Sequence, residues 1–485
     1  MDQPATPALN AFFEAYCRRR PVNASFLGIH DHDDLLPDFS EAGIADTVDE
    51  MATLRSRLNG NSVDEQLARS FLTIQSREYV SDHFYRSNPA LYTGEAIFGI
   101  LTSPQRLTAV PRLLAQARAN VRTAPMEWTR RAIQECRAAL KILERIPESE
   151  DARKAFQEFE SHLAHEVLQH PCDQYGCGFD FFDLLMKEGH RMRQSTDEFL
   201  RFAEDEFDKH RHAQSPPDHP TIHDLNQHQA CWDECRGIVE NRQLLTWPEF
   251  PLMFTRPPDL IRDAAQDLYY LSYRSPAAFN SSLPHRCEVT PCGPITLKLN
   301  HVVHHAGPGH HVQNYYAYRS PSLIGKIAAV DCASRIALFC GGTMAEGWAC
   351  YATDLMEEFD FLNAEERRHQ EHTRLRMAAR GIVDIKLHCL QMTFAEAVDF
   401  YRTQVGMSEV AATKEAVRNS MFPGTAMMYL LGTSTIHRLR QELGSRMTLR
   451  EFHDRFLSYG SIPVAMIADL MTASSATLET QMGVE

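Results

Sequence analysis

The chain has 485 residues, of which 44% are hydrophobic and 23% charged, and its 49 basic and 64 acidic side chains give a net charge of −15. These values are ordinary for a globular protein, so the chain can bury a sizeable core. Its acidity, with no basic stripe that carries interleaved aromatic residues, argues against a nucleic-acid partner.

The first residues of the chain, 1–7, carry no basic region and no apolar run, so a secretory signal is not expected. No stretch approaches the apolar length of a membrane-spanning helix. We therefore predict a cytoplasmic protein with no membrane partner and with reduced thiols at its twelve cysteines. We expect plain thiols rather than a structural metal at the cysteine pairs, which are Cys172 and Cys177, Cys231 and Cys235, and Cys287 and Cys292.

Apolar residues recur at helical spacing in five segments, which are residues 8–17, 46–58, 64–84, 125–146 and 197–209. Proline clusters predict loops at 213–221 and 251–258. Residues 287–300 alternate in the manner of a strand on both sides of Pro291 to Pro294, which predicts a short hairpin. Helices resume after it, with a turn at 421–424. We predict a mainly α protein forming a single domain, 1–485, which could divide into lobes at 1–212 and 222–485.

Five histidines fall between His301 and His311, in the string His-Val-Val-His-His-Ala-Gly-Pro-Gly-His-His. His304 and His311 would lie about 10.5 Å apart along a straight helix, too far to share one zinc ion through bonds of about 2.0–2.1 Å. Pro308 breaks a helix, and the flanking glycines allow unusual backbone angles. The chain can therefore turn and bring His310 or His311 back towards His304. Each histidine alone could be a turn residue, but five around one bend favour a transition-metal site.

Glu346 follows as a carboxylate among small and apolar residues, in the string Met-Ala-Glu-Gly-Trp-Ala. An ionised carboxylate buried in such a helix is costly unless it has a partner. That partner could be an arginine, or Glu346 could cap a helix that begins near Thr343. The histidines upstream favour a metal, with Glu346 as the third ligand.

These motifs resemble those of the domain-of-unknown-function 885 family, which is similar to zinc metallopeptidases of the gluzincin type. The string from His304 to Gln313 resembles the family's usual His-Glu-Ala-x-Pro-Gly-His-His-x-Gln, and Glu346-Gly-Trp-Ala resembles its second signature. Weaker resemblances follow the family's order along the chain, at 26–31, 380–388, 423–432, 451–454 and 460–463. The resemblance implies a large multi-helix, metallopeptidase-like fold with the metal between a histidine helix and a glutamate helix.

The resemblance also implies a ligand set of His304, Glu346 and one of His310 and His311. We favour His310, with His311 as the alternative ligand or as a residue that orients one. The chain departs from the family at His305, where the family has the glutamate that serves zinc peptidases as general base. A neutral imidazole, with an ordinary pKa of about 6.5, can also accept a proton. His305 is therefore a candidate base, a fourth ligand, or a remnant of an ancestral site.

Arg380, Asp384 and His388 are spaced four residues apart and form one polar stripe on a predicted helix. The stripe could be a solvated face with one ion pair. The resemblance supports a cleft wall, in which Arg380 binds a substrate carboxylate and His388 assists proton transfer. Tyr429 could donate a hydrogen bond to a developing oxyanion, or it could pack as an ordinary core tyrosine.

We therefore predict a metal-dependent, hydrolase-like enzyme that acts on a small amide, a short peptide or an amino-acid-derived substrate. Zn²⁺ is the expected metal, and Fe²⁺ or Mn²⁺ would also suit the donors. One alternative is a lyase or rearrangement enzyme in which His305 is the base. Another is a catalytically inactive metal-binding protein, which the loss of the family's glutamate supports. Replacing His305 by alanine would lower activity in either enzyme and change nothing in an inactive protein.

Overall fold

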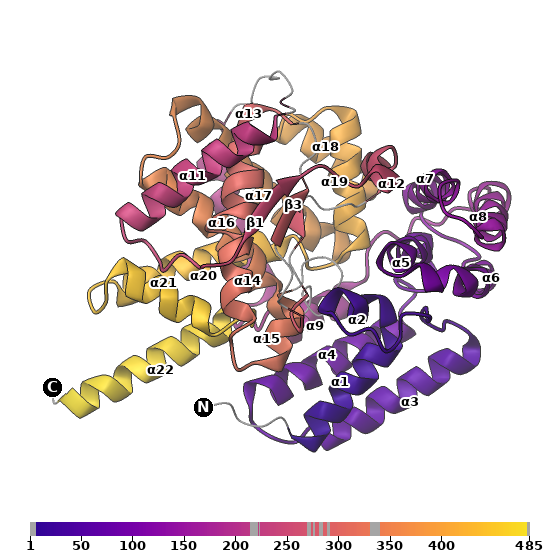
Figure 1. Ribbon diagram of the computed structural model, residues 1–485, viewed down its shortest axis with the longest axis horizontal. Helices are drawn as coiled ribbons and strands as arrows, with labels where there is room; N and C mark the ends of the chain where they lie inside the picture. Colours follow the sequence, from indigo (N-terminus) through magenta and orange to yellow (C-terminus); the bar gives the residue numbers. More distant parts are fainter. Residues whose placement is uncertain are drawn as a thin grey trace.

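The computed structural model describes residues 6–213, 222, 224–268, 273–274, 277–280, 285–288, 292–329 and 340–482. Most of these residues are helical and the strands are short, so the predicted mainly α fold is confirmed (Figure 1). Within the described ranges, none of the helices combines the length and apolar character that crossing a membrane requires.

The helices of the first half begin where the sequence supplies caps. Ser40, Ser62 and Ser195 each accept a hydrogen bond from a backbone N–H in the first turn of the following helix, as N-cap residues do. All five helices predicted in this half are present, with ends shifted by a few residues. The elements are α1 (Pro7–Arg19), α2 (Pro21–Leu27), α3 (Glu41–Arg57), α4 (Val63–Val80), α5 (Pro89–Thr102), η1 (Pro104–Ala109), α6 (Val110–Asn120), α7 (Met126–Leu143), α8 (Glu150–His162), η2 (Leu163–Val167), α9 (Phe179–Leu184), η3 (Leu185–Gly189) and α10 (Thr196–His210).

The second half supplies the helices that surround the histidine cluster. Its long helix α17 begins with a capping box in which Asn363 and Glu366 satisfy each other's backbone N–H groups. The predicted turn at 421–424 is confirmed, with Gly424 in the left-handed region. The elements are α11 (Leu225–Asn241), α12 (Asp259–Arg262), η4 (Ala265–Asp267), α13 (Pro294–Thr296), η5 (Leu297–Ala306), α14 (His310–Ala317), α15 (Leu323–Ala328), α16 (Gly342–Glu358), α17 (Ala364–His388), α18 (Phe394–Gln404), α19 (Glu409–Met421), α20 (Met427–Leu443), α21 (Leu449–Ser458) and α22 (Val464–Met482).

A small sheet lies beside η5, and it differs from the predicted hairpin. Strands β1 (Leu252–Thr255), β2 (Tyr273–Arg274) and β3 (His285–Glu288) are ordered β1-β3-β2, with β3 parallel to β1 and antiparallel to β2. The hairpin is wrong because Pro294 starts a helix, where its fixed φ angle and missing N–H are tolerated. The loop predicted at 251–258 is also partly wrong, because it contains β1.

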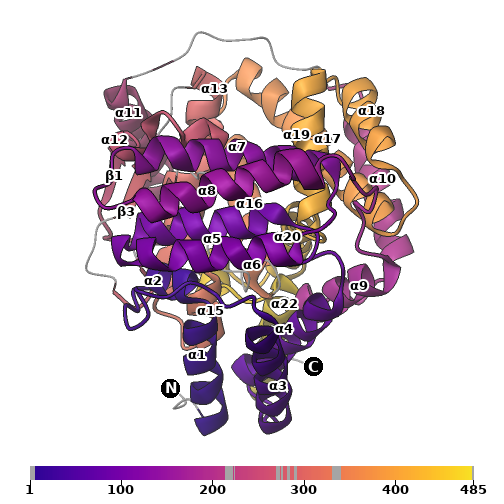
Figure 2. The same cartoon turned by 90° about the vertical axis from the view of Figure 1, so that its right-hand side faces the viewer.

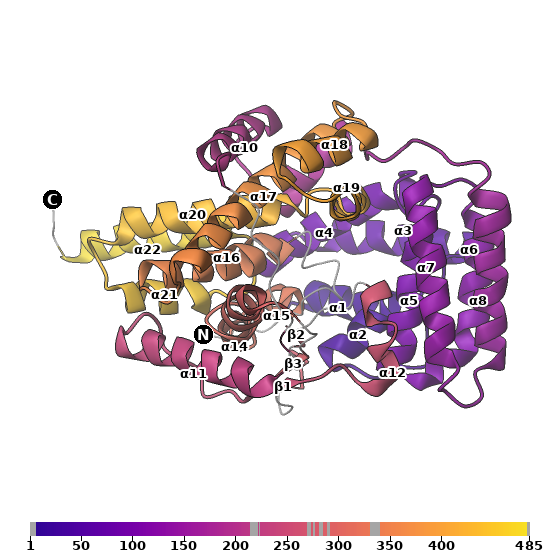
Figure 3. The ribbon, with the colours of Figure 1, turned by 90° about the horizontal axis from the view of Figure 1, so that it is seen from above.

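Two hydrophobic cores hold the helices together. The larger core joins Leu9 and Phe71 from the first helices to Ile467 from the last one. The smaller core is centred on α5, α6, α7 and α8, which run side by side at one edge of the molecule (Figures 2 and 3). Neither core ends at residues 212–222, because the larger core contains residues from both sides of this segment. The predicted loop at 213–221 lies outside the described residues except for Ala213. The division into two lobes stays a prediction.

Candidate metal centre

The histidine string begins on a π-helix and continues after a sharp turn. His301, His304 and His305 lie on η5, which has π-helical geometry. π-Helices are rare in proteins, and those that occur often lie at functional sites. Residues 307–309 then turn the chain into α14. A Cβ atom added at Gly309 would lie 2.0 Å from the carbonyl oxygen of His304. Glycine is therefore required at this position for the turn to close.

Two buried tryptophans fix the turn in place. Trp232 on α11 donates its indole N–H to the carbonyl of Ala306 at 2.7 Å, and Trp348 on α16 donates to the carbonyl of Pro308 at 2.8 Å. Trp348 follows Glu346 by two residues on the same helix. The turn that carries the histidines is thus tied directly to the helix that carries the glutamate.

The turn returns His310 to the side of His304, and Glu346 faces both. The His304 and His310 ring centroids are 4.9 Å apart, and Glu346 Oε2 lies 3.4 Å from His304 Nε2 and 3.8 Å from His310 Nε2. Ligand atoms bound tetrahedrally to one zinc at about 2.0–2.2 Å are separated by about 3.3–3.6 Å. The distances from Glu346 to the two histidines are therefore close to those expected for ligands of one shared metal ion. One ring nitrogen of His305 joins the cluster, within 4.8 Å of nitrogens of His304 and His310.

Glu346 is held in this position by a close helix crossing. Gly347 packs against Gly432 of α20, and a Cβ atom at Gly347 would lie 2.4 Å from the Gly432 Cα atom. The Oε2 atom of Glu346 is buried and makes no hydrogen bond of good geometry with a described residue. Burial raises the pKa of this carboxyl group, but the nearby His304, His310 and Arg418 outweigh it and bring the pKa to about 2.

A divalent metal fits these residues. A buried carboxylate oxygen that lacks a hydrogen bond needs a positive partner, and two imidazoles with one carboxylate are the protein donors of a common type of catalytic zinc site. The second ring nitrogen of His310 is also oriented. His310 Nδ1 lies 3.4 Å from Gln313 Oε1, and Gln313 in turn donates to the hydroxyl of Ser461. Such outer contacts set which nitrogen of a histidine can bind a metal.

His305 has one ring nitrogen committed to the backbone. Its Nδ1 donates to the carbonyl of Asn300 at 2.9 Å, because a carbonyl oxygen can only accept. Nε2 of the neutral ring therefore keeps its lone pair. Burial, and then the neighbouring His304, His310 and His301, hold the pKa of His305 well below its usual range. Tyr273 of β2 stacks on the ring, with centroids 6.1 Å apart, so the small sheet helps to orient His305.

His311 points away from the centre. Its buried ring contacts Trp247 and Phe250, at centroid distances of 6.3 and 6.2 Å. Consecutive residues of an α-helix point about 100° apart, so His310 and His311 cannot both face His304. The structure brings His310 rather than His311 to His304 and Glu346.

A cavity of about 1110 Å³ opens onto the centre, with His304, His305 and Glu346 in its wall. Helices α16, α17 and α20, which run alongside one another (Figure 3), supply much of the remaining wall. Pockets for small molecules typically measure about 300–1000 Å³. The cavity is therefore large enough for a short peptide or a small metabolite.

Five arginines line the cavity, and three of them, which lie close to one another, differ in their partners. Arg380 donates twice to the carboxylate of Glu415, both at 2.6 Å. Arg418 donates to the hydroxyl of Tyr429 at 2.8 Å. The Nε atom of Arg376, one turn before Arg380, is buried and makes no hydrogen bond with a described residue. Arg380 was predicted to bind a substrate carboxylate, but a glutamate of the protein already occupies its guanidinium.

Tyr429 lies in the cavity wall, where its hydroxyl keeps a hydrogen that it can donate. His388, by contrast, does not line the cavity. It is fully buried, its Nδ1 accepts from the backbone N–H of Cys177, and its Nε2 donates to the carbonyl of Asn419. The cleft-wall position predicted for His388 is wrong, because the polar stripe is turned into the core after Arg380.

Three residues of this centre were not predicted from the sequence. Arg376 and Arg418 lie in the cavity wall, and Tyr273 stacks on His305 and His310. Arg376 precedes Arg380 by one helical turn, so the polar stripe already contained a signal for it. Arg418 and Tyr273 reach the centre only through tertiary packing, and nothing in their local sequence marks them.

Comparisons with known proteins give one family match and several similar solved structures. The model of a family described as "Bacterial protein of unknown function (DUF885)" matches residues 226–471, the part of the chain that carries the candidate metal centre. No curated protein matches the chain.

Two solved structures share the fold. A protein from Shewanella oneidensis, described as "a putative lipoprotein of unknown function", is 20% identical with a TM-score of 0.75, over 96% of this chain and 99% of that one. A protein from Colwellia psychrerythraea, described as "the putative lipoprotein", is 16% identical with a TM-score of 0.68, over 95% of this chain and 97% of that one. At these identities the likeness concerns the fold alone.

Proposed function

We propose that this chain, which belongs to the DUF885 family of bacterial proteins of unknown function, is a metal-dependent enzyme that hydrolyses a small amide or peptide-like substrate. The observation that carries the proposal is the convergence of His304, His310 and Glu346, with His304 and Glu346 in the wall of a large cavity. We also propose that the fold is metallopeptidase-like and that the metal is Zn²⁺ rather than Fe²⁺ or Mn²⁺.

His304 Nε2, His310 Nε2 and Glu346 Oε2 would hold the metal, which would supply a Lewis acid and an activated water. His305 takes the role of general base. Its Nδ1–H is anchored on the Asn300 carbonyl, which leaves the Nε2 lone pair to accept a proton from water. The hydroxyl of Tyr429, held by Arg418, donates a hydrogen bond to the oxygen on which negative charge develops.

Arg376 supports a substrate that carries a carboxylate. Its neighbours Arg380 and Arg418 are engaged by Glu415 and Tyr429, whereas its buried Nε has no such partner. A guanidinium binds a carboxylate through charge-assisted hydrogen bonds. We therefore assign the recognition of a free carboxylate to Arg376, which takes over the role predicted for Arg380.

The first test is the metal content of the purified protein, measured by mass spectrometry. We expect Glu346→Gln and His304→Ala each to lose one equivalent relative to the wild type. Glu358→Gln, which changes an exposed carboxylate on the same helix, should lose none. Retention of the wild-type metal content in both site variants would overturn the proposed centre.

The second test is turnover of dipeptides and N-acyl amino acids that carry a free carboxylate. Turnover by the wild type that falls in His305→Ala would support hydrolysis with His305 as base. Turnover of elimination substrates alone would support the lyase alternative, and a metal-loaded protein that turns over neither class would support the inactive one. The cytoplasmic location stays a prediction that nothing tests, and the two similar structures reported above are described as putative lipoproteins.

A further inference from the structure

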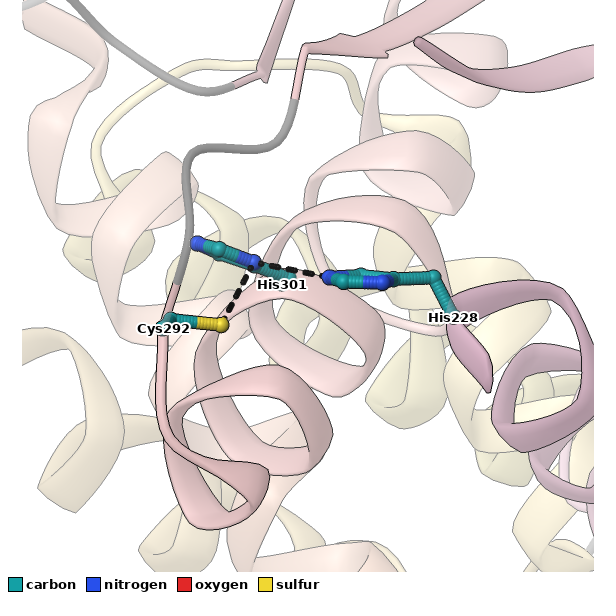
Figure 4. A group of neighbouring side chains, drawn as sticks. All are labelled: His228, Cys292 and His301. Carbon is teal, nitrogen blue, oxygen red and sulfur yellow. Dashed lines mark hydrogen bonds between the residues drawn. The ribbon is translucent and has the colours of Figure 1, made fainter. Parts of the chain in front are cut away.

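We propose that His228, Cys292 and His301 form a second metal site, suited to Zn²⁺, beside the centre formed by His304, His310 and Glu346. The three side chains converge from different segments of the chain (Figure 4). His228 lies on α11, Cys292 precedes α13, and His301 lies on η5. This inference does not depend on the proposed hydrolytic function, because it uses none of the three ligands assigned to the first centre.

Two of the three distances between the donor atoms fit one tetrahedral ion, and all three lie within 4.8 Å. His228 Nε2 lies 3.3 Å from His301 Nδ1, and Cys292 Sγ lies 3.5 Å from the same nitrogen. For Zn–N bonds of about 2.0–2.1 Å and Zn–S bonds of about 2.3 Å, a tetrahedron separates two nitrogens by about 3.3 Å and a nitrogen from a sulfur by about 3.6 Å. Both measured distances agree with these values to about 0.1 Å.

The backbone fixes two of the ligands in advance. His228 Nδ1 donates to the carbonyl of Asp224 at 3.1 Å, so the lone pair of the neutral ring is on Nε2, which faces His301. Cys292 forms a bridge with Ile222, with N···O distances of 2.7 and 3.4 Å. This bridge holds the thiol against the start of α11, which carries His228.

The chemistry of the donors favours zinc. Two imidazoles and one thiolate are borderline-soft to soft ligands of the kind that bind Zn²⁺, and Cys₂His₂ and Cys₂His sets are common zinc sites. Cys292 is a free thiol, as are the nine other cysteines whose side chains the structure describes. On binding, the Cys292 S–H bond breaks, the sulfur keeps the electron pair for the metal, and the proton passes to solvent. His228 and His301 are 1% and 4% exposed, so the ion would be largely shielded from water.

Such an ion would connect three segments around the π-helix. His228 and His301 are 73 residues apart in the chain, and His301 shares η5 with His304 and His305. The ion would therefore clamp η5 onto α11 at His301, in addition to the hydrogen bond from Trp232 of α11 to Ala306. This is a structural role, expected to stabilise the helix that presents the first centre.

Cobalt distinguishes the two sites by their donors. We would remove metal from the full-length protein with a chelator, add Co²⁺, and record the absorption spectrum. A thiolate bound to Co²⁺ gives an intense near-ultraviolet charge-transfer band, whereas the first centre contains only nitrogen and oxygen donors. We expect this band in the wild type and in Glu346→Gln. It should be lost in Cys292→Ser and retained in Cys231→Ser, which changes another partly buried cysteine, on α11.

A second variant distinguishes the loss of a metal ligand from misfolding of the protein. His228→Gln keeps the thiol, and we expect its band to need a Co²⁺ concentration at least about tenfold higher, because even an outer-shell change costs about 10–100-fold in metal affinity. Circular dichroism would confirm that each variant keeps its helices. The proposal would be overturned if the wild type gave no band, or if the band survived Cys292→Ser. The three side chains would then be in ordinary contact without binding a metal. Loss of metal from Glu346→Gln with the band intact would separate the two sites.

Discussion

Gly347 sets the distance between α16 and α20, and replacing it by alanine tests whether that distance matters. The new Cβ atom would lie 2.4 Å from the Cα atom of Gly432 and 2.6 Å from its carbonyl carbon. Both obstructing atoms belong to the backbone of a buried helix, so no side-chain rotation can relieve the contact. Gly381 offers a matched control on α17, because a Cβ atom there would meet only side-chain atoms at 3.6 to 3.9 Å.

The expected magnitudes follow from two opposing effects. Alanine in place of glycine within a helix stabilises by about 1 kcal/mol, and this effect alone should act at Gly381. Overpacking typically costs about 1–3 kcal/mol, and a backbone obstruction belongs at the upper end of that range. Gly347→Ala should therefore destabilise the fold by about 2 kcal/mol, and Gly381→Ala should stabilise it by about 1 kcal/mol.

Thermal unfolding monitored by circular dichroism measures the difference. With an unfolding entropy of about 2.1 cal/mol/K per residue, a chain of 485 residues changes its Tm by about 1 °C per kcal/mol. The two variants should therefore differ in Tm by about 3 °C, with the wild type between them. Because Glu346 is the preceding residue, Gly347→Ala should also bind metal more weakly. Equal melting temperatures for the two variants would refute the idea that the Gly347–Gly432 crossing sets the position of Glu346.

Three further predictions concern the base, the substrate and the pH dependence of stability. His305→Glu, which restores the family's residue, should raise kcat for amide substrates, and a fall as large as that of His305→Ala would contradict the base assignment. Arg376→Gln should raise KM by about 10–100-fold for substrates with a free carboxylate, since hydrogen bonds to charged groups contribute about 1.5–3 kcal/mol; an equal rise for the amidated substrate would count against this role. Burial lowers the pKa of His453 to about 4, so below about pH 6.5 the unfolded chain binds a proton that the folded chain does not. The contribution of His453 to the unfolding free energy should therefore fall by about 1.4 kcal/mol for each pH unit lost between pH 6.5 and 4. Unfolding free energies measured by urea titration at several pH values should depend less steeply on pH in His453→Gln than in the wild type.

The sequence pattern was sufficient for the helices and insufficient for the sheet. Helix signals are local, because an apolar face repeats every three to four residues and a cap such as Ser195 lies next to the helix it starts. The segment after Pro294 alternates like a strand, but it forms α13 and then η5. Its residues Leu297, Leu299, Val302 and Val303 are all buried, so the alternation reflected burial on more than one side. A short apolar run cannot by itself distinguish a strand from a buried helix.

The candidate site was predictable only where its residues share one segment or match a family motif. The turn at residues 307–309 and the meeting of His304 with His310 follow from the positions of glycine and proline. Arg418 comes to the cavity from α19, and Tyr273 comes from a two-residue edge strand of the small sheet. Their contribution depends on how distant elements pack, which no local pattern encodes. For His388 the local pattern was misleading. It places His388 on the same helix stripe as Arg380, but only Arg380 lines the cavity and His388 is buried in the core.

The number of histidines in the string was a weaker guide than it first appears, because the backbone divides the five among three environments. The π-helix and the turn bring His304, His305 and His310 together, whereas His311 packs against Trp247 and Phe250. His301 instead meets His228 and Cys292. A dense cluster of one residue type thus need not mean one site. What identifies a site is whether the remaining ligands, here Glu346 for one group and Cys292 for the other, are brought to the same point by different elements. That criterion depends on tertiary structure, and it makes the two groups separately testable with Glu346→Gln and Cys292→Ser.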